Sequence, residues 1–133
     1  MIFLFTATSV LAQSNHVDLE SLVYINDKSH VEGSETPFTG QVVDSYSDGQ
    51  KSLERTYKDG KANGLSTWWY DDGKKEYESV YKDGVRNGIA TSWHENGSKE
   101  WQASYKDGTR DGKTSSWHAN GKREKRAYYL DFK

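Results

Sequence analysis

The stretch GLSTWWYDDGKKEYESVYKDGVRN, from Gly64 to Asn87, returns almost in register along most of the 133-residue chain. Its leading glycine has counterparts at steps of 24 residues, at Gly40, Gly88 and Gly112. The tyrosine that precedes Lys-Asp-Gly in this stretch, Tyr81, recurs at the same step. A fixed period of about 20–50 residues is typical of supersecondary units stacked along an axis. The period therefore predicts a repeat array before any residue propensity is considered.

Each repeat divides into two extended segments separated by turn chemistry. The first strand is expected at 65–70, 89–94 and 113–118, and the second at 75–81 and its equivalents. No window has a sustained helical period, and glycines arrive too often for helices. The expected turn glycines are Gly49, Gly60, Gly64, Gly73, Gly84, Gly88, Gly97, Gly108, Gly112 and Gly121. The predicted fold is all-β: an elongated single-sheet rod of antiparallel β-hairpins, with about four 24-residue repeats and about eight strands.

Alternation along the strands predicts which side chains share a face. Residues 65, 67 and 69 lie on one side of the first strand, so Trp69, Trp93 and Trp117 form a column. A hairpin loop with an odd number of residues brings Tyr77 and Tyr81 to the same side, and an even loop brings Glu76 and Glu78 there instead. Because buried carboxylates are costly, the odd loop is expected. The predicted aromatic face comprises Trp69, Tyr77, Tyr81, Trp93, Trp101, Tyr105, Trp117 and Tyr129.

This predicted face is the candidate binding surface, since flat rings stack on sugars, bases and apolar side chains. The competing interpretation is that the rings pack on one another along the rod and form its core. Of the two, packing is favoured.

The N-terminus carries an apolar run, Met1 to Ala12, that contains no charged residue. Its length suits the apolar segment of a signal peptide, with cleavage expected before Gln13. A membrane-spanning helix needs about 20 residues, so this run is too short to cross a bilayer as a helix. The basic residues that normally begin a signal peptide are missing, so the true start of the reading frame stays open. We interpret the run as an export signal, which places the mature protein in a periplasm or outside the cell.

The segment 13–39 lies outside the period and precedes the repeats at 40–133. Its β-rich run Leu22-Val23-Tyr24-Ile25 stops at the turn signal Asn26-Asp27, and a second strand is expected from Val31. Repeat arrays need caps at their ends, so this segment is predicted to be an N-terminal capping hairpin. At the other end, Phe132 is expected to fold over the last aromatic row as a C-terminal cap.

Composition and spacing argue against several functional classes. Net charge is −2, which gives no bulk attraction to nucleic acid, and cysteine is absent, which excludes disulfides and thiolate chemistry.

His94 and His118 recur at the period, but Tyr46 and Tyr70 hold the equivalent positions, so a replaceable surface residue is favoured over a metal ligand. The repeated carboxylates at Glu76, Glu100 and Glu124 each follow a base and indicate a solvated face. No catalytic residue, metal or cofactor is therefore expected.

The repeated segments resemble the bacterial variant of the MORN (membrane occupation and recognition nexus) repeat. The resemblance rests on Tyr-Lys-Asp-Gly-(x)2-Asn-Gly at 57–64 and 81–88 and on Trp-x-x-Asn-Gly ending at Gly97 and Gly121. It covers 37–133. The period of 24 differs from the roughly 23 residues of the better-studied repeat. The resemblance implies a scaffold that binds proteins or lipids; many bacterial members carry an antitoxin label.

Three functions remain open from the sequence. The first is a non-enzymatic exported scaffold whose partner is a protein or an anionic envelope surface. The second is a carbohydrate or cell-wall binding module, because tandem Gly- and aromatic-rich hairpins also occur in such proteins. The third is an intracellular, antitoxin-like neutraliser of a protein, which requires that the apolar N-terminus is not an export signal.

Overall fold

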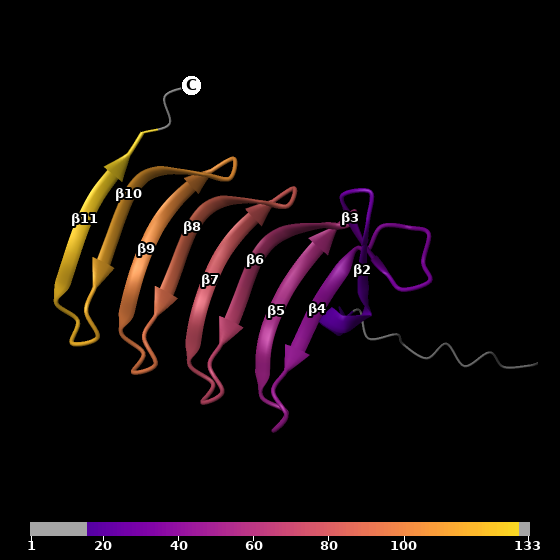
Figure 1. The fold of residues 1–133 in the computed structure, drawn as a ribbon, viewed down its shortest axis with the longest axis horizontal. Helices are drawn as coiled ribbons and strands as arrows, with labels where there is room; N and C mark the ends of the chain where they lie inside the picture. The colour runs from indigo at the N-terminus through magenta and orange to yellow at the C-terminus, as the bar shows by residue number, and fades with distance from the viewer. Residues whose placement is uncertain (1–15, 131–133) are drawn as a thin grey trace, which may run out of the picture.

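The computed structural model describes residues 16–130, and almost all of its regular structure is β (Figure 1). One sheet contains nine strands, in the order β1-β4-β5-β6-β7-β8-β9-β10-β11. These strands are β1 (His16–Val17), β4 (Gly40–Ser45), β5 (Lys51–Lys58), β6 (Lys61–Trp69), β7 (Lys75–Lys82), β8 (Val85–Trp93), β9 (Lys99–Lys106), β10 (Thr109–Trp117) and β11 (Arg123–Tyr129). From β4 onward each strand pairs antiparallel with the next, so the predicted eight-strand hairpin array is confirmed. The proposed signal segment 1–12 and the expected cap at Phe132 lie outside the described residues.

One edge of the sheet is formed by three-residue hairpin loops. In the β6–β7 loop the Tyr70 N–H donates to the Lys74 carbonyl (2.8 Å), and the Gly73 N–H donates to the Tyr70 carbonyl (3.0 Å). Gly73 has φ +82°, a left-handed conformation that glycine adopts without strain. This is a type I turn followed by a left-handed glycine. The odd loop expected from the sequence is therefore present.

The predicted aromatic face is nevertheless wrong, because a β-bulge follows the loop. Trp69 pairs with Lys75, but Trp68 pairs with Tyr77, so Glu76 is an extra residue without a partner in β6. The extra residue reverses the parity of the rest of β7. The same shift recurs in the β8–β9 and β10–β11 pairs. As a result Trp69, Trp93 and Trp117 lie on the opposite side of the sheet from Tyr77, Tyr81, Trp101, Tyr105 and Tyr129.

The opposite edge is formed by the Lys-Asp-Gly turns, which are two-residue loops. Asp59 (φ +50°) and Gly60 (φ +79°) connect the paired residues Lys58 and Lys61, and both left-handed φ angles are those of a type I′ turn. The first strand of the repeat thus begins at Lys61, four residues earlier than predicted.

Asn63-Gly64 and its equivalents are consequently not turns. Gly64, Gly88 and Gly112 lie inside β6, β8 and β10, where the register with the preceding strand shifts. Their φ angles of +102°, +129° and +95° show that the irregularity itself requires glycine. The glycines are conformationally necessary, as the sequence indicated, but they bend a long strand instead of reversing the chain.

An N-terminal hairpin adjoins the turn edge of the first repeat (Figure 1). Its strands, β2 (Leu22–Ile25) and β3 (Lys28–Val31), flank a two-residue turn at Asn26-Asp27. The predicted hairpin and turn are thus confirmed, but the second strand begins at Lys28 and not at Val31. Before it, a 3-10 turn (η1, Leu19–Ser21) leads from β1, which pairs parallel with β4.

The buried hydrophobic residues form two small clusters in the described part of the chain. One contains Val42, Leu53, Tyr57 and Ala62, and the other contains Ala90, Ala103 and Tyr105. The registers place all seven on the side of the sheet that carries Tyr77. That side therefore has most of the apolar packing of a thin, single-layer fold.

Candidate interaction surface

The face that carries Tyr77 combines aromatic rings with arginines, and we call it the arginine face. It is defined by Arg55, Trp68, Tyr77, Tyr81, Arg86, Trp101, Tyr105, Arg110 and Tyr129. Trp68, Tyr77 and Trp101 form a row, with ring centroids 5.2 and 5.8 Å apart. These separations are typical of favourable tilted aromatic pairs.

Three guanidinium groups lie over these rings. Arg55 Cζ is 4.8 Å from the centroid of Trp68 and 5.3 Å from that of Tyr81. Arg86 Cζ is 5.8 Å from Tyr77 and 5.3 Å from Tyr105. Arg110 Cζ is 5.6 Å from Tyr129, and its Nε donates to the Tyr105 hydroxyl at 3.3 Å. Cation–π contact thus holds a row of positive charges along the rod.

The carboxylates near this face do not pair with its arginines. The registers place Asp44 on the arginine face, and Glu100 and Glu124 accept hydrogen bonds from Ser92 and Ser116 of that face at 2.7 and 3.0 Å. The ion pairs of residues 16–130 join Lys51 with Glu54, Lys75 with Glu78 and Lys74 with Asp72, and none contains an arginine. Arg55, Arg86 and Arg110 therefore have no charge partner within the described chain.

Buried donors at the same place also lack partners. Ser66 and Ser79 are 1% exposed, and neither hydroxyl has a hydrogen bond within residues 16–130. Arg55 Nε likewise has no hydrogen-bond partner within residues 16–130. Ser66 is the cross-strand neighbour of both Arg55 and Ser79. Unpaired buried polar groups are uncommon in folded proteins. The centre of the arginine face thus contains three buried polar atoms without a hydrogen-bond partner in the described chain.

The opposite side, which we call the glutamate face, has a different character. It is defined by Leu65, Trp69, Glu78, Ile89, Trp93, Gln102 and Trp117. Each of its tryptophans lies under a lysine, at 5.5 Å for Lys51, 5.7 Å for Lys75 and 6.0 Å for Lys99. Leu65 and Ile89, about half exposed, present aliphatic surface between them. The three predicted binding tryptophans are thus isolated from the other five predicted rings.

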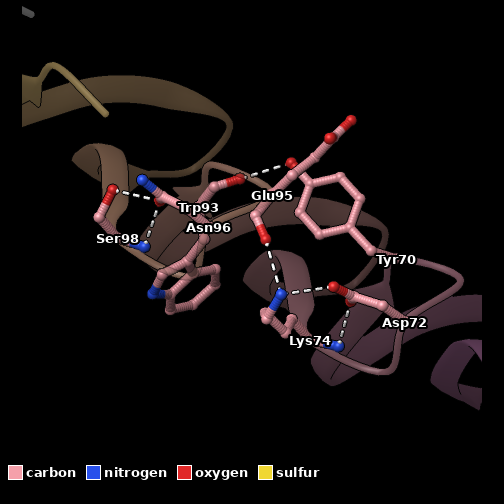
Figure 2. Close-up of polar contacts among 7 residues, drawn as sticks. All are labelled: Tyr70, Asp72, Lys74, Trp93, Glu95, Asn96 and Ser98. Atoms are coloured by element: carbon pink, nitrogen blue, oxygen red, sulfur yellow. Dashed lines mark hydrogen bonds and ion pairs between the residues drawn. The ribbon is translucent and has the colours of Figure 1, made fainter. Parts of the chain in front are cut away.

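The three-residue loops are joined to one another by a ladder of side-chain hydrogen bonds. The Tyr46 hydroxyl donates to the Trp69 carbonyl at 2.6 Å. The Tyr70 hydroxyl donates to the Trp93 carbonyl, also at 2.6 Å (Figure 2). His94 Nε2 lies 2.9 Å from the Trp117 carbonyl, and because a carbonyl only accepts, Nε2 carries the proton. The sequence interpretation of these residues as replaceable surface positions missed this role. The sequence did contain a signal for this ladder, because Tyr46, Tyr70 and His94 are 24 residues apart and each carries a hydrogen-bond donor on its ring.

Titration of the ladder tyrosines gives a testable alkaline transition. Burial, followed by Glu76, raises the pKa of both Tyr46 and Tyr70 above the ordinary value of 10.0. The folded state therefore holds these protons more tightly than the unfolded state does, and this stabilisation is lost as pH rises above 10 through the folded pKa.

The test is a double variant, Tyr46→His with Tyr70→His, in which both positions carry the residue found at 94. We expect this variant to lose less stability between pH 9 and 11 than the parent chain. A neutral imidazole keeps its N–H donor across this range. The measurement is urea unfolding at each pH. Parallel declines of the two proteins would show that the tyrosine protons are not linked to folding.

The structure also bears on the other candidate sites. Within residues 16–130, no group of three or more His, Asp or Glu side chains is arranged to hold a metal ion. Between the same limits, no helix has the length and apolar character required to cross a bilayer.

Comparison with known proteins identifies the repeat. A family model described as the MORN repeat variant matches residues 62–83, 86–107 and 110–131. Each match covers one hairpin, β6–β7, β8–β9 or β10–β11, and the β4–β5 hairpin has the same form outside the matched residues. No curated protein matches the chain significantly. MORN repeats are non-catalytic units that generally bind proteins or membranes. The chain is therefore a MORN-repeat protein, with repeats of about 24 residues built as successive β-hairpins of one sheet.

Proposed function

We propose that this chain is a non-enzymatic, exported scaffold that binds a protein partner through the arginine face. The observation that carries the proposal is the composition of that face, in which tyrosine, tryptophan and arginine alternate along one side of the sheet. Protein interfaces are enriched in these three residues, and their binding energy concentrates in them. The glutamate face also carries three tryptophans, but lysines lie over them, and two of these lysines pair with glutamates; lysine and glutamate are depleted in protein interfaces.

The dimensions of the rod suit this role. Eight strands spaced about 4.8 Å apart extend over roughly 34 Å, and eight residues at about 3.4 Å give a strand length of roughly 27 Å. One face therefore covers on the order of 900 Å². A specific interface of standard size buries about 800 Å² on each partner. A single face is thus large enough to hold a partner without contribution from the other.

Photo-crosslinking can test which face is used. Arg110 and Lys113 are both exposed in β10 and lie on the arginine face and the glutamate face, respectively. We expect a photoreactive amino acid at 110 to form a protein adduct in the source cells, and the same residue at 113 to form none. An adduct from 113 alone, or none from either position, would contradict the proposal, and mass spectrometry of the adduct identifies the partner.

Export is the second part of the proposal, and it is supported by the apolar Met1–Ala12 run. The expected mature protein begins at Gln13. Intact-mass measurement of the protein isolated from its source determines this directly. A chain that keeps Met1 would instead favour the intracellular, antitoxin-like alternative.

A further inference from the structure

We propose that the arginine face binds an acidic segment of its partner in the polyproline II conformation, with a carboxylate at every third residue. This inference rests on the proposed function and specifies the chemistry of the partner. It commits to an extended acidic peptide; a folded acidic surface or an anionic membrane would give different outcomes in the test below.

The charge of the partner follows from the arginines. Arg55, Arg86 and Arg110 carry three positive charges along one side of the sheet, and within residues 16–130 no carboxylate forms an ion pair with them. Arginine binds carboxylates through paired, planar hydrogen bonds, and each guanidinium is already positioned by the ring beneath it. A negatively charged partner therefore meets preorganised donors.

The spacing of the arginines favours one backbone conformation. Arg86 and Arg110 occupy equivalent positions in β8 and β10, two strands apart, so their attachment points are separated by roughly 9.6 Å. A polyproline II helix has three residues per turn and rises about 3.1 Å per residue, which brings every third side chain to the same side at about 9.3 Å. A β-strand repeats its side chains at about 6.7 Å, which does not match the interval from Arg86 to Arg110. Arg55, in β5, is not at an equivalent position and adds charge without sharing this spacing.

The rings between the arginines suit the same ligand. Tyr77, Trp101 and Tyr105 lie between or beside the guanidinium groups. Aromatic residues in grooves are the usual receptors for polyproline II segments, whose preformed conformation loses little entropy on binding.

The backbone of such a segment adds acceptors. Polyproline II has no internal hydrogen bonds, so all its carbonyl oxygens remain available as acceptors. Arg110 is exposed and has guanidinium N–H groups besides the Nε that donates to Tyr105. A carboxylate-bearing, acceptor-rich segment can accept hydrogen bonds from these donors.

The test uses the full chain and fluorescein-labelled synthetic peptides in an anisotropy titration at low salt. The probe contains four tandem copies of the triplet Glu-Pro-Pro. One control replaces every glutamate of the probe with glutamine and so lacks the charge. The other is a block peptide, in which all the glutamates of the probe come first and all its prolines follow, so that the composition is the same without the spacing.

We expect the Glu-Pro-Pro probe to bind at least tenfold more tightly than either control. Equal binding of the block peptide would overturn the spacing argument. No binding of the probe would overturn the inference as a whole.

Two matched double variants locate the site. Arg86→Gln with Arg110→Gln removes two charges from the arginine face, and Lys82→Gln with Lys106→Gln removes two from exposed positions on the glutamate face. We expect the arginine pair to weaken binding of the Glu-Pro-Pro probe at least tenfold and the lysine pair to change it less than twofold. Equal effects would show non-specific attraction and overturn the inference. Arg110→Gln alone, at an exposed position, provides the same comparison if the double variant is poorly folded.

The outcomes also separate this inference from the proposed function. A crosslink from position 110 together with no binding of the Glu-Pro-Pro probe leaves a protein-binding scaffold with a different partner chemistry. Arginine-dependent sedimentation with vesicles of phosphatidylglycerol, in the absence of peptide binding, would identify a membrane surface and overturn both proposals.

Discussion

We expect Gly60→Ala to destabilise the protein by about 3 kcal/mol, whereas Gly84→Ala, at the equivalent position of the next repeat, costs about 1 kcal/mol. Both glycines occupy the second position of a type I′ turn, with φ +79° and +85°, so the conformational strain of an alanine is the same. The difference lies in what surrounds them. A Cβ on Gly60 would lie 2.7 Å from Lys28 Cβ and 3.0 Å from the Ser29 backbone N and O, whereas on Gly84 its nearest neighbour is Lys61 Cβ at 3.7 Å.

The close approach at Gly60 arises because three backbone hydrogen bonds form a closed ring there. Ser29 N–H donates to the Gly60 carbonyl (2.8 Å), Phe38 N–H to the Ser29 carbonyl (2.8 Å), and Gly60 N–H to the Phe38 carbonyl (2.7 Å). The N-terminal hairpin is held to the first repeat by this ring. An added methyl group must push the hairpin away, so the hydrogen bonds and the packing are lost together.

Thermal unfolding of the two variants measures the effect, with a Tm loss of about 10 °C expected for Gly60→Ala and a few degrees for Gly84→Ala. Amide exchange provides the local control. Ser29 and Phe38 should exchange faster in Gly60→Ala and remain protected in Gly84→Ala. Equal destabilisation of the two variants would mean that turn strain alone, and not the docked hairpin, determines the cost.

The architecture was accessible from the sequence because its signals are local and repeated. Asp-Gly and Asn-Gly pairs at a fixed period specify tight turns, and the turns specify strand length. A prediction of hairpins therefore needed no knowledge of long-range contacts. The boundary errors have a local cause as well: Asn63-Gly64 looks like a turn, but its glycine serves a bulge within β6.

The distribution of side chains between the faces could not be obtained in this way. One unpaired residue, Glu76, reverses every later side chain in its strand, and nothing in its identity distinguishes a bulge from regular pairing. Trp68 and Trp69 are adjacent and chemically identical, so which of them shares a face with Tyr77 depends entirely on that residue. The arginine face was missed for the same reason, because Arg55, Arg86 and Arg110 join the rings only in the observed register.

We expect Tyr77→Ala to cost about 2–3 kcal/mol, and Tyr77→Phe to be neutral or slightly stabilising. Tyr77 is half-buried between Trp68 and Trp101 and covers the cluster that contains Ala90 and Ala103. Removing the ring separates the two tryptophans and exposes that cluster. Its hydroxyl, by contrast, is buried without a hydrogen-bond partner in the described chain, so phenylalanine keeps the packing and removes an unsatisfied group.

Urea unfolding measures both variants, and near-UV circular dichroism reports the loss of the ordered Trp68–Tyr77–Trp101 row. A repeat array is stabilised by contacts between neighbours, so an interruption at Tyr77 weakens the coupling between the repeats on either side of it. The unfolding transition of Tyr77→Ala is therefore expected to broaden as well as to shift. If phenylalanine costs as much as alanine, the hydroxyl has a bonding role that the packing does not explain, and the aromatic row is not what joins the two halves of the rod.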